Sequence, residues 1–343
     1  MKTKTKIRLQ HLALILGAIL LIYTVIALFP RSKGFTPDNP MRTNSDLPIL
    51  IAHGGGNREF PDNTLEAFYN AYSVDPRVMM ETDVSITKDG VVILSHDTTL
   101  DRKTNVTGNI ADWNYSDLIA EKVDFGYTNP TEDGKLNGER KHFADENGIE
   151  KYPTDVPYPD GVSPRDEAVF LATTLEELLT AFPENRINVE IKQSGDLGFK
   201  ALAEVLRLLE KHGAFDRVVL ASFHEELYDE FKRLQKDGEV PETFMCSPAT
   251  AGVAGFFVTQ LLHVDLFYGE PICVFQVPTE QMGLDLATKG FVNAAHKHNY
   301  AVHYWTVNDR DEMRHLIDIG ADGIMTDYPH RLKEVYDAYR AET

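Results

Sequence analysis

Three acidic residues lie inside short apolar runs of the sequence. Glu81 and Asp83 occur two positions apart in the run 79–86, and Glu190 occurs in the run 186–192. Side chains two positions apart on a strand point to the same face, so Glu81 and Asp83 are expected to lie together. A buried carboxylate is costly unless it is paired or binds a metal, and carboxylate oxygens are ligands of Ca²⁺ and Mg²⁺. The three acids therefore predict a site for one divalent cation, against the alternative that they are solvated on an outer face.

Two histidines close apolar runs of the same kind. His53 ends the run 48–53, and His96 ends the run 91–96. A histidine beside a metal site can act as general base or general acid. A lone histidine at the end of a strand is more often structural. The prediction that His53 and His96 are a catalytic pair therefore depends on the acids that accompany them.

Three other residues are candidates for contact with a substrate, two of them with its phosphate. Lys192 follows Glu190 by two positions and can hold a phosphate oxygen as a point charge. Gly54 opens a run of three glycines, whose backbone N–H groups can approach an anion closely. Trp305, in the run 301–307, is a candidate for substrate contact, although an isolated tryptophan is usually part of a core.

The elements that would carry these residues alternate between strands and helices. Strands are predicted at 48–53, 79–86, 91–96, 186–192, 217–223, 243–247, 272–277, 301–307 and 322–326. Helices are predicted at 63–73, 174–182, 197–212, 225–236, 285–298 and 309–319. This alternation predicts an α/β fold with a parallel sheet, and its length favours a (β/α)₈ TIM barrel over residues 48–335. An open doubly wound sheet is the alternative. In a barrel, polar residues at the carboxyl ends of the strands meet at one face, where catalysis takes place.

One stretch interrupts the alternation. Residues 121–168 are polar and rich in Pro, Gly and Asp, with little periodicity. A loop of that length inside a compact domain is usually a functional lid or a disordered excursion. We therefore expect a long inserted loop in the barrel at 121–168.

The first part of the chain has the pattern of a membrane anchor. Residues 12–30 are apolar and uncharged, and they follow a basic tail at 1–11. This pattern predicts one transmembrane helix in the cell membrane, with a cytoplasmic N-terminus and an extracytoplasmic barrel. The alternative is a cleaved signal peptide with its cleavage site near Val25-Ile26-Ala27. Residues 31–47 read as a linker.

The composition narrows the choice of partners. The formal net charge is −19, and the basic residues of the N-terminal segment make the remainder of the chain more acidic still. Such a surface repels a phosphate backbone, so nucleic-acid binding is not expected. A site for a phosphate would then need a local positive centre, which a bound cation can supply. With two cysteines only, the fold does not depend on a disulfide framework.

Taken together and in order, these residues resemble the glycerophosphodiester phosphodiesterase family. The resemblance runs from about residue 48 to 332. It is carried by Ala52-His53-Gly54-Gly55, Pro61-Asp62-Asn63-Thr64-Leu65-Glu66-Ala67, Glu81-Thr82-Asp83-Val84, Thr87-Lys88-Asp89-Gly90, His96-Asp97, Leu100-Asp101-Arg102, Thr174-Leu175-Glu176-Glu177, Val189-Glu190-Ile191-Lys192, Trp305-Thr306-Val307-Asn308 and Gly323-Ile324-Met325-Thr326-Asp327-Tyr328-Pro329.

The resemblance implies a metal-dependent TIM-barrel hydrolase. It implies that Glu81, Asp83 and Glu190 ligate the ion, and that His53 and His96 form the acid–base pair, although His96 is also a possible ligand. The expected reaction converts a glycerophosphodiester to an alcohol and glycerol phosphate. The alternatives from other classes are a non-catalytic anchored binding protein and a lyase that releases a cyclic phosphate.

The sequence departs from the family pattern in two places. The family often has Arg directly after the first histidine, where it can clasp the phosphate, and this chain has Gly54. Arg58 lies close in sequence and is a candidate replacement. The family's usual Glu before Asn-Thr is Asp62 in this chain. These changes bear on phosphate affinity and substrate choice.

The second half of the chain resembles the branch with lysophospholipase D-type members. The blocks that carry this likeness are Gln276-Val277-Pro278, Ala294-Ala295-His296 and His303-Tyr304-Trp305. Lysophospholipids are therefore candidate substrates. The mostly apolar segment between Ala249 and Phe267 would accept an acyl chain or dip into a bilayer, or else form an ordinary barrel helix.

Overall fold

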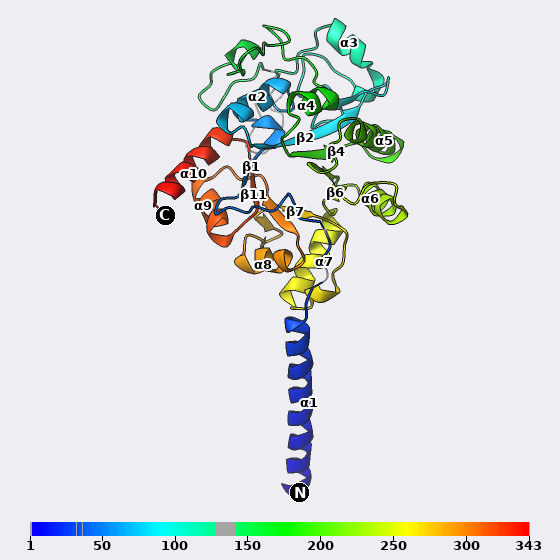
Figure 1. Ribbon diagram of the computed structural model, residues 1–343, viewed down its shortest axis with the longest axis vertical. Coiled ribbons are helices and arrows are strands. Elements are labelled where there is room, and N and C mark those ends of the chain that lie inside the picture. The colour runs from blue at the N-terminus through cyan, green and yellow to red at the C-terminus, as the bar shows by residue number, and fades with distance from the viewer. Residues whose placement is uncertain (1, 32, 36, 128–140, 343) are drawn as a thin grey trace.

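A ring of parallel strands forms the centre of the computed structural model, which describes residues 2–31, 33–35, 37–127 and 141–342 (Figure 1). The order around the ring is β6-β5-β4-β2-β1-β11-β10-β7. The N–H of Cys273 donates to the carbonyl of Cys246 at 3.1 Å and so links the two ends of the ring. The strands are β1 (Ile49–Ala52), β2 (Met79–Ile86), β4 (Ile187–Ile191), β5 (Val218–Ala221), β6 (Met245–Cys246), β7 (Val274–Val277), β10 (Ala301–Tyr304) and β11 (Gly323–Thr326). The predicted α/β barrel is confirmed as a nearly closed parallel barrel.

Helices surround this ring, because a helix with an apolar face is stabilised when that face is buried against the strands. They are α2 (Leu65–Val74), α4 (Leu175–Ala181), α5 (Gly195–Lys211), α6 (Glu225–Asp237), α7 (Thr250–Leu261), α8 (Lys289–Lys297), α9 (Arg310–Ile319) and α10 (Pro329–Glu342). The helices α2, α4, α8 and α9 each begin after a residue whose side chain accepts a backbone N–H. Asp309 accepts hydrogen bonds from the N–H groups of Asp311 and Glu312, and Gly320 ends α9 with a φ of +80°. The helix α10 and the short helix α3 (Tyr115–Ala120) were not predicted.

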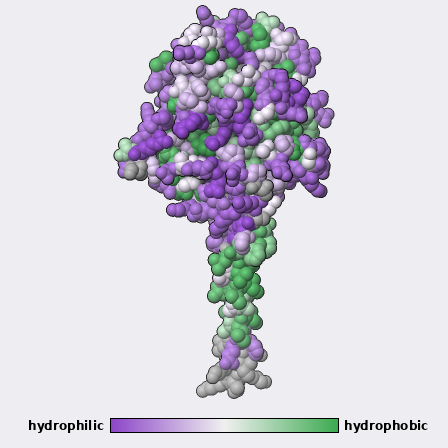
Figure 2. Space-filling view, in the orientation of Figure 1, coloured by the Kyte–Doolittle hydropathy of each residue, from purple (hydrophilic) through white to green (hydrophobic). Residues whose placement is uncertain are grey.

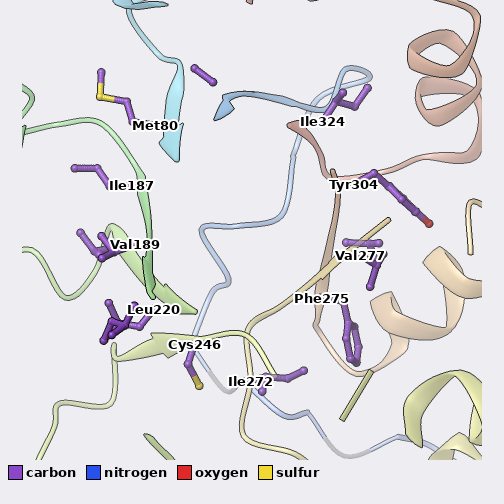
Figure 3. Close-up of a cluster of buried hydrophobic side chains, with 14 of the residues drawn as sticks. Met80, Ile187, Val189, Leu220, Cys246, Ile272, Phe275, Val277, Tyr304 and Ile324 are labelled. Atoms are coloured by element: carbon purple, nitrogen blue, oxygen red, sulfur yellow. The ribbon is translucent and has the colours of Figure 1, made fainter. Parts of the chain in front are cut away.

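Side chains of the strands divide between two apolar layers, as alternation requires. Outward-facing residues fill the space between strands and helices, and Figure 3 shows them distributed around the ring. Inward-facing residues form a smaller cluster inside the barrel, made of Ile49, Ile51, Met79, Val219, Met245, Cys273, Val274, Ala301 and Met325. This inner cluster fills one end of the barrel, and the carboxyl ends of the strands remain for polar residues.

One predicted strand does not belong to the parallel ring. β3 (Val92–Leu94) pairs antiparallel with β2, with Val84 opposite Leu94 and Ile86 opposite Val92. The chain therefore turns back after β2. A strand adjacent in sequence and joined by a short turn pairs antiparallel, whereas a parallel partner needs a crossover.

The segment predicted as a linker packs against the barrel. Phe35 and Met41 are buried in the inner cluster. The side-chain amide of Asn39 donates to the carbonyls of Cys273 at 2.6 Å and Asn299 at 2.7 Å. His303, inside the barrel, has its Nε2 2.8 Å from the carbonyl of Met41. Residues 33–35 and 37–47 thus cover the amino-terminal end of the barrel.

The predicted insert at 121–168 includes residues 128–140, which lie outside the described residues. The parts on either side, 121–127 and 141–168, contain the short 3₁₀ helix η3 (Pro153–Asp155). Phe125, Phe143 and Val156 are buried. Two of them join an apolar cluster with Phe60 and Phe170 beside the barrel. The described parts of the insert therefore pack onto the barrel.

The long helix α1 (Lys2–Leu28) projects from the barrel (Figure 1). Figure 2 shows that most of the coloured part of α1 is apolar at its surface, whereas the barrel surface is mostly hydrophilic. Within the part of the chain that the structure describes, no helix meets both the length and the apolarity needed to cross a membrane. The transmembrane anchor therefore stays a prediction.

Candidate active site

The register of the strands sets the predicted site residues side by side. Ala52 pairs with Met80 of β2 and with Thr326 of β11. The next residue of each strand therefore reaches the same level, which aligns His53 with Glu81 and with Asp327. Two residues after Glu81 on β2, Asp83 pairs directly with Glu190 of β4. All of these side chains continue the inward-facing positions of their strands, so they meet above the inner cluster.

The three predicted metal ligands form one cluster. An oxygen of each of Glu81, Asp83 and Glu190 lies within 4.8 Å of the others. Burial and the charge of Asp83 raise the pKa of Glu81 to about 8, and burial raises the pKa of Glu190. Three carboxylates therefore lie close together in a largely buried position. An all-oxygen donor set of this kind fits a hard divalent cation.

Lys192 lies against two of these carboxylates. Its Nζ is 2.9 Å from Asp83 and 2.7 Å from Glu190. Burial alone lowers the pKa of Lys192, but the two carboxylates outweigh it and raise that pKa. The same ammonium keeps the pKa of Asp83 below its ordinary value despite burial. Oε2 of Glu81 lies 4.0 Å from Nε2 of His53 and accepts the backbone N–H of Gly54 at 2.8 Å.

His53 lies between two carboxylates. Its Nδ1 is 2.6 Å from Oδ1 of Asp327, and its Nε2 is 4.0 Å from Oε2 of Glu81. Burial alone lowers the pKa of His53, but the hydrogen bond to Asp327 and the nearby negative charges raise it to about 10. Asp327 is itself fixed, because the amide of Asn308 donates to its Oδ2 at 2.7 Å. Asp327 and Asn308 therefore orient the imidazole of His53.

His96 reaches the site from the hairpin rather than from a parallel strand. β3 runs back along β2, and the N–H of Ser95 donates to the carbonyl of Asp83 at 2.9 Å. The next residue, His96, is therefore level with the acidic cluster. Its Nδ1 lies 3.0 Å from Asp97 and 3.2 Å from Nη2 of Arg102. With 46% of its side chain exposed, His96 is the more open of the two histidines.

A cavity of about 520 Å³ opens over this cluster. Its polar end is formed by His53, Glu81, Asp83, His96, Glu190 and Lys192. Its other walls are mainly apolar and come from α7, from β7 and from the hairpin of β8 (Glu280–Gln281) and β9 (Leu284–Asp285). These walls include Val253, Ala254, Phe257, Val258, Met282, Leu284 and Trp305.

Comparison with known proteins identifies the family to which the chain is similar. A solved phosphodiesterase from Oleispira antarctica, in complex with the product sn-glycerol-3-phosphate, superposes with a TM-score of 0.58 at 20% identity, covering 85% of this chain and 97% of that one. Glycerophosphodiester phosphodiesterase from Thermotoga maritima gives a TM-score of 0.56 at 23% identity, covering 84% and 98%. At these identities the likeness supports the barrel fold. Residues 53–331 match the sequence model of the glycerophosphoryl diester phosphodiesterase family.

The chain belongs to that family. It is a phosphodiester hydrolase of phospholipid metabolism, as the sequence predicted. Lysophospholipase D GDPD1 from Mus musculus is 26% identical over 312 residues, which cover 85% of this chain and 87% of the mouse protein. A glycerophosphodiester phosphodiesterase from Bacillus altitudinis is 25% identical over 292 residues, covering 83% and 97%.

Gly54 occupies the position at which the family often has Arg, and the structure leaves little room for a side chain there. Gly54 has a φ of +55°, and a Cβ built there would lie 2.8 Å from the Cβ of Asp62. Asp62 is itself held by Lys103 and by Asn63. The short turn after β1 therefore accepts glycine and excludes the larger residue.

The structure does not bring Arg58 to this cavity. Its backbone N–H donates to the carbonyl of Asp327 at 3.2 Å, and its side chain lines a separate polar cavity with Tyr328 and Arg331. Arg58 is not among the residues that line the cavity over the acidic cluster, and its role as a replacement for the family Arg stays a prediction. Among described residues, the basic groups beside the acids and His96 are Lys192 and Arg102.

Trp305, for which substrate contact is predicted, lines the cavity. Its ring meets that of Phe223 edge to face, with centroids 6.0 Å apart. Nζ of Lys192 lies 5.9 Å from the centre of the same Phe223 ring. Both aromatic residues line the cavity, and the ring of Phe223 lies beside its charged end.

Sequence reasoning missed three residues that position the site. Asp327 and Asn308 orient His53, and the amide of Asn63 donates to Oδ2 of Asp83 at 3.0 Å. All three lie inside the motifs that carry the family resemblance, but the motifs alone predicted no role for them. The signal that identifies Asp327 is its place one residue beyond β11, since β11 adjoins the strand that ends before His53.

Proposed function

We propose that this phosphodiesterase cleaves lysophospholipids, releasing the headgroup alcohol and an acylated glycerol phosphate. The observation that supports this substrate is the apolar extension of the site cavity, formed by α7 and the β8–β9 hairpin. A deacylated glycerophosphodiester needs only the polar end. A wall of apolar side chains beside a charged cluster matches a ligand with a phosphate at one end and an acyl chain at the other.

We further propose that Glu81, Asp83 and Glu190 hold a single Ca²⁺ or Mg²⁺ ion. The bound ion would neutralise charge on the phosphoryl oxygens as a Lewis acid. Lys192, already beside two of the ligands, would turn toward a phosphate oxygen and add a second positive charge. Trp305 would pack against the glycerol or headgroup portion of the substrate.

The two histidines would divide the proton transfers. His53, placed between Asp327 and Glu81, is favoured as imidazolium and would protonate the leaving alcohol oxygen. His96, more open to solvent, would take the proton from the attacking hydroxyl, which is water or the neighbouring glycerol hydroxyl. One P–O bond forms and the P–O bond to the headgroup breaks. If the glycerol hydroxyl attacks, a cyclic phosphate forms first and water then opens it.

The experiment compares two substrates that share a headgroup. The full chain in detergent is given glycerophosphocholine or lysophosphatidylcholine, with and without EDTA, and choline release is followed. We expect EDTA-sensitive release from lysophosphatidylcholine. Release from glycerophosphocholine alone would refute the lysophospholipid proposal, and no release with Ca²⁺ or Mg²⁺ present would refute both. ³¹P NMR of the first-formed product distinguishes direct hydrolysis from a cyclic phosphate that is released and persists.

A pair of variants in α7 tests the acyl site directly. Ala254 lines the cavity, whereas Ala251 is exposed on the same helix and does not. Ala254→Trp should fill the apolar end and raise KM for lysophosphatidylcholine by about tenfold or more, while Ala251→Trp should not. Equal KM values for both variants would show that the acyl chain binds elsewhere.

We propose also that α1 anchors the protein in the cell membrane, with residues 1–11 in the cytoplasm and the barrel outside. The support is the row of exposed apolar side chains from Leu12 to Phe29, with basic residues on both sides. The chain should remain in the membrane pellet after carbonate extraction, and protease added outside intact cells should digest the barrel. Release by carbonate would refute the anchor.

A further inference from the structure

An exposed apolar surface runs from the cavity to the end of α7. The helix carries no charged residue in an otherwise acidic protein. Large apolar side chains are exposed along it, on the following 3₁₀ helix η4 (Asp265–Phe267) and on the β8–β9 hairpin, where Met282 is 93% exposed. We call this surface the apolar rim; its residues are Val258, Leu261, Leu262, Phe267, Met282 and Leu284.

The apolar rim is continuous with the cavity. Val258, Met282 and Leu284 line the cavity and are also exposed to solvent. Leu261 and Leu262 follow Val258 by three and four residues, so they lie on the same side of α7, one turn further on. An acyl chain that left the cavity past Val258 would therefore remain on apolar side chains.

The far end of the rim is joined to α1. Arg31, just after α1, makes a two-pronged ion pair with Asp265 at 2.7 and 2.8 Å, and both side chains are buried. Nε2 of His298 lies 3.3 Å from the same carboxylate. The rings of Tyr23 and His263 are 6.2 Å apart, edge to face. These contacts fix the direction of α1 relative to α7 and η4.

The position of α1 gives the barrel a defined orientation. In Figure 1 the labelled helices encircle the strands, and α1 leaves the ring on the side of α7. The barrel therefore lies on its side relative to α1. If α1 stands in a lipid layer, α7 faces that layer, while α3 lies at the opposite end of the molecule.

We propose that the apolar rim rests on the lipid layer that holds α1, and that the cavity takes its acylated substrate directly from that layer. This inference rests on the lysophospholipid substrate and the anchor proposed above. Uncharged apolar side chains suit the acyl boundary of a lipid surface. The occupant is therefore a lipid surface rather than a protein.

A nitroxide probe measures where the rim lies, independently of activity. The full chain is reconstituted in phosphatidylcholine vesicles with Leu262→Cys or, as control, Ala120→Cys in α3, each spin-labelled. Cys246 and Cys273 are buried and leave little background. We expect the probe at 262 to be relaxed by oxygen and shielded from a water-soluble nickel complex, and the probe at 120 to be reached by the nickel complex. Equal nickel access at both positions would overturn the proposal. Shielding of position 262 from both reagents, dependent on protein density, would instead indicate a second copy of the chain.

Turnover provides the second readout. The double variant Leu261→Glu/Leu262→Glu should reduce hydrolysis of lysophosphatidylcholine in vesicles by about tenfold or more, because charge on the rim opposes its contact with lipid. Hydrolysis of soluble glycerophosphocholine, or binding of Ca²⁺ where that substrate is not cleaved, should not change. Phe199→Glu, an exposed apolar position on α5, is the matched control. If the wild type cleaves vesicle lysophosphatidylcholine and the double variant equals it, the rim proposal fails alone. If the wild type does not cleave it, the substrate proposal fails, and the probe measurement still decides the position of the rim.

Discussion

Nδ1 of His53 lies 2.6 Å from a carboxylate oxygen of Asp327, at the junction of β1 and β11. The pairing of Ala52 with Thr326 produces this contact, because each strand places its next residue at the same level. The amide of Asn308 holds the second oxygen of Asp327 at 2.7 Å. A polar pair at the base of the site thus sets both the orientation and the charge of the imidazole.

Asp327→Asn should weaken the imidazolium form of His53. The negative charge of Asp327 helps to raise the pKa of His53 to about 10, so its removal lowers that pKa. If His53 is the general acid, the alkaline limb of the pH–rate profile moves to lower pH, and kcat falls by roughly 10–100-fold. NMR titration of the imidazole and the pH–rate profile measure the two effects. A slower enzyme with an unmoved alkaline limb would assign Asp327 a structural role only.

Glu190→Gln should remove the metal-dependent activity without unfolding the barrel. The change removes one anionic ligand from the acidic cluster and keeps the volume of the side chain. We expect calorimetric titration to show a loss of Ca²⁺ or Mg²⁺ affinity, with a far-UV circular dichroism spectrum like that of the wild type. Glu242→Gln, at an exposed position, is the control. Full activity in Glu190→Gln would show that Glu190 is not a ligand.

Metal affinity should increase with pH up to about 8. Burial and the charge of Asp83 raise the pKa of Glu81 to about 8, so below this pH a proton competes with the ion for the carboxylate. The apparent affinity should therefore decrease by up to about tenfold per pH unit below 8, and binding should release a proton. Calorimetry at pH 6 and pH 8, in buffers of different ionisation enthalpy, measures both quantities. A constant affinity without proton release would contradict the proposed ligation by Glu81.

Lys192→Met should destabilise the metal-free protein in particular. Lys192 is the cation that Asp83 and Glu190 contact, and removing one partner of a buried ion pair costs about 3–5 kcal/mol. A divalent ion at the same carboxylates should restore much of that loss. Chemical denaturation with and without Ca²⁺ or Mg²⁺ measures the free energy of unfolding. If the ion stabilises the variant no more than the wild type, the ion does not bind at this cluster.

Gly54→Ala should be poorly tolerated. The residue has a φ of +55°, and a Cβ there would lie 2.8 Å from the Cβ of Asp62. Gly213→Ala is a matched control, since Gly213 has a φ of +58° and no atom within 4 Å of its Cβ position. We expect Gly54→Ala to lower the free energy of unfolding by about 1–3 kcal/mol more than Gly213→Ala does. Equal losses would show that the turn can move away from Asp62.

The sequence alone predicted the alternation of strands and helices, for which a barrel was favoured over an open sheet, and the composition of the charged site. The strands of the ring, β3 and several of the helices were predicted from local periodicity, which depends only on neighbours in the chain, whereas β8, β9, α3 and α10 were not. Alternation along β2 and β4 placed Glu81, Asp83 and Glu190 on inward-facing positions, and the structure brings their oxygens within 4.8 Å. These features were predictable because their physical cause lies within one element.

Only the tertiary structure decided how the elements meet. His96 joins the site through the antiparallel return of β3, although a parallel strand was expected. Asp327 becomes the partner of His53 through the register of β1 and β11, and residues 37–47 of the predicted linker pack on the end of the barrel. Arg58, five residues after His53, lines a different cavity. Register and packing depend on contacts between residues far apart in the chain, and local pattern carries no direct record of them.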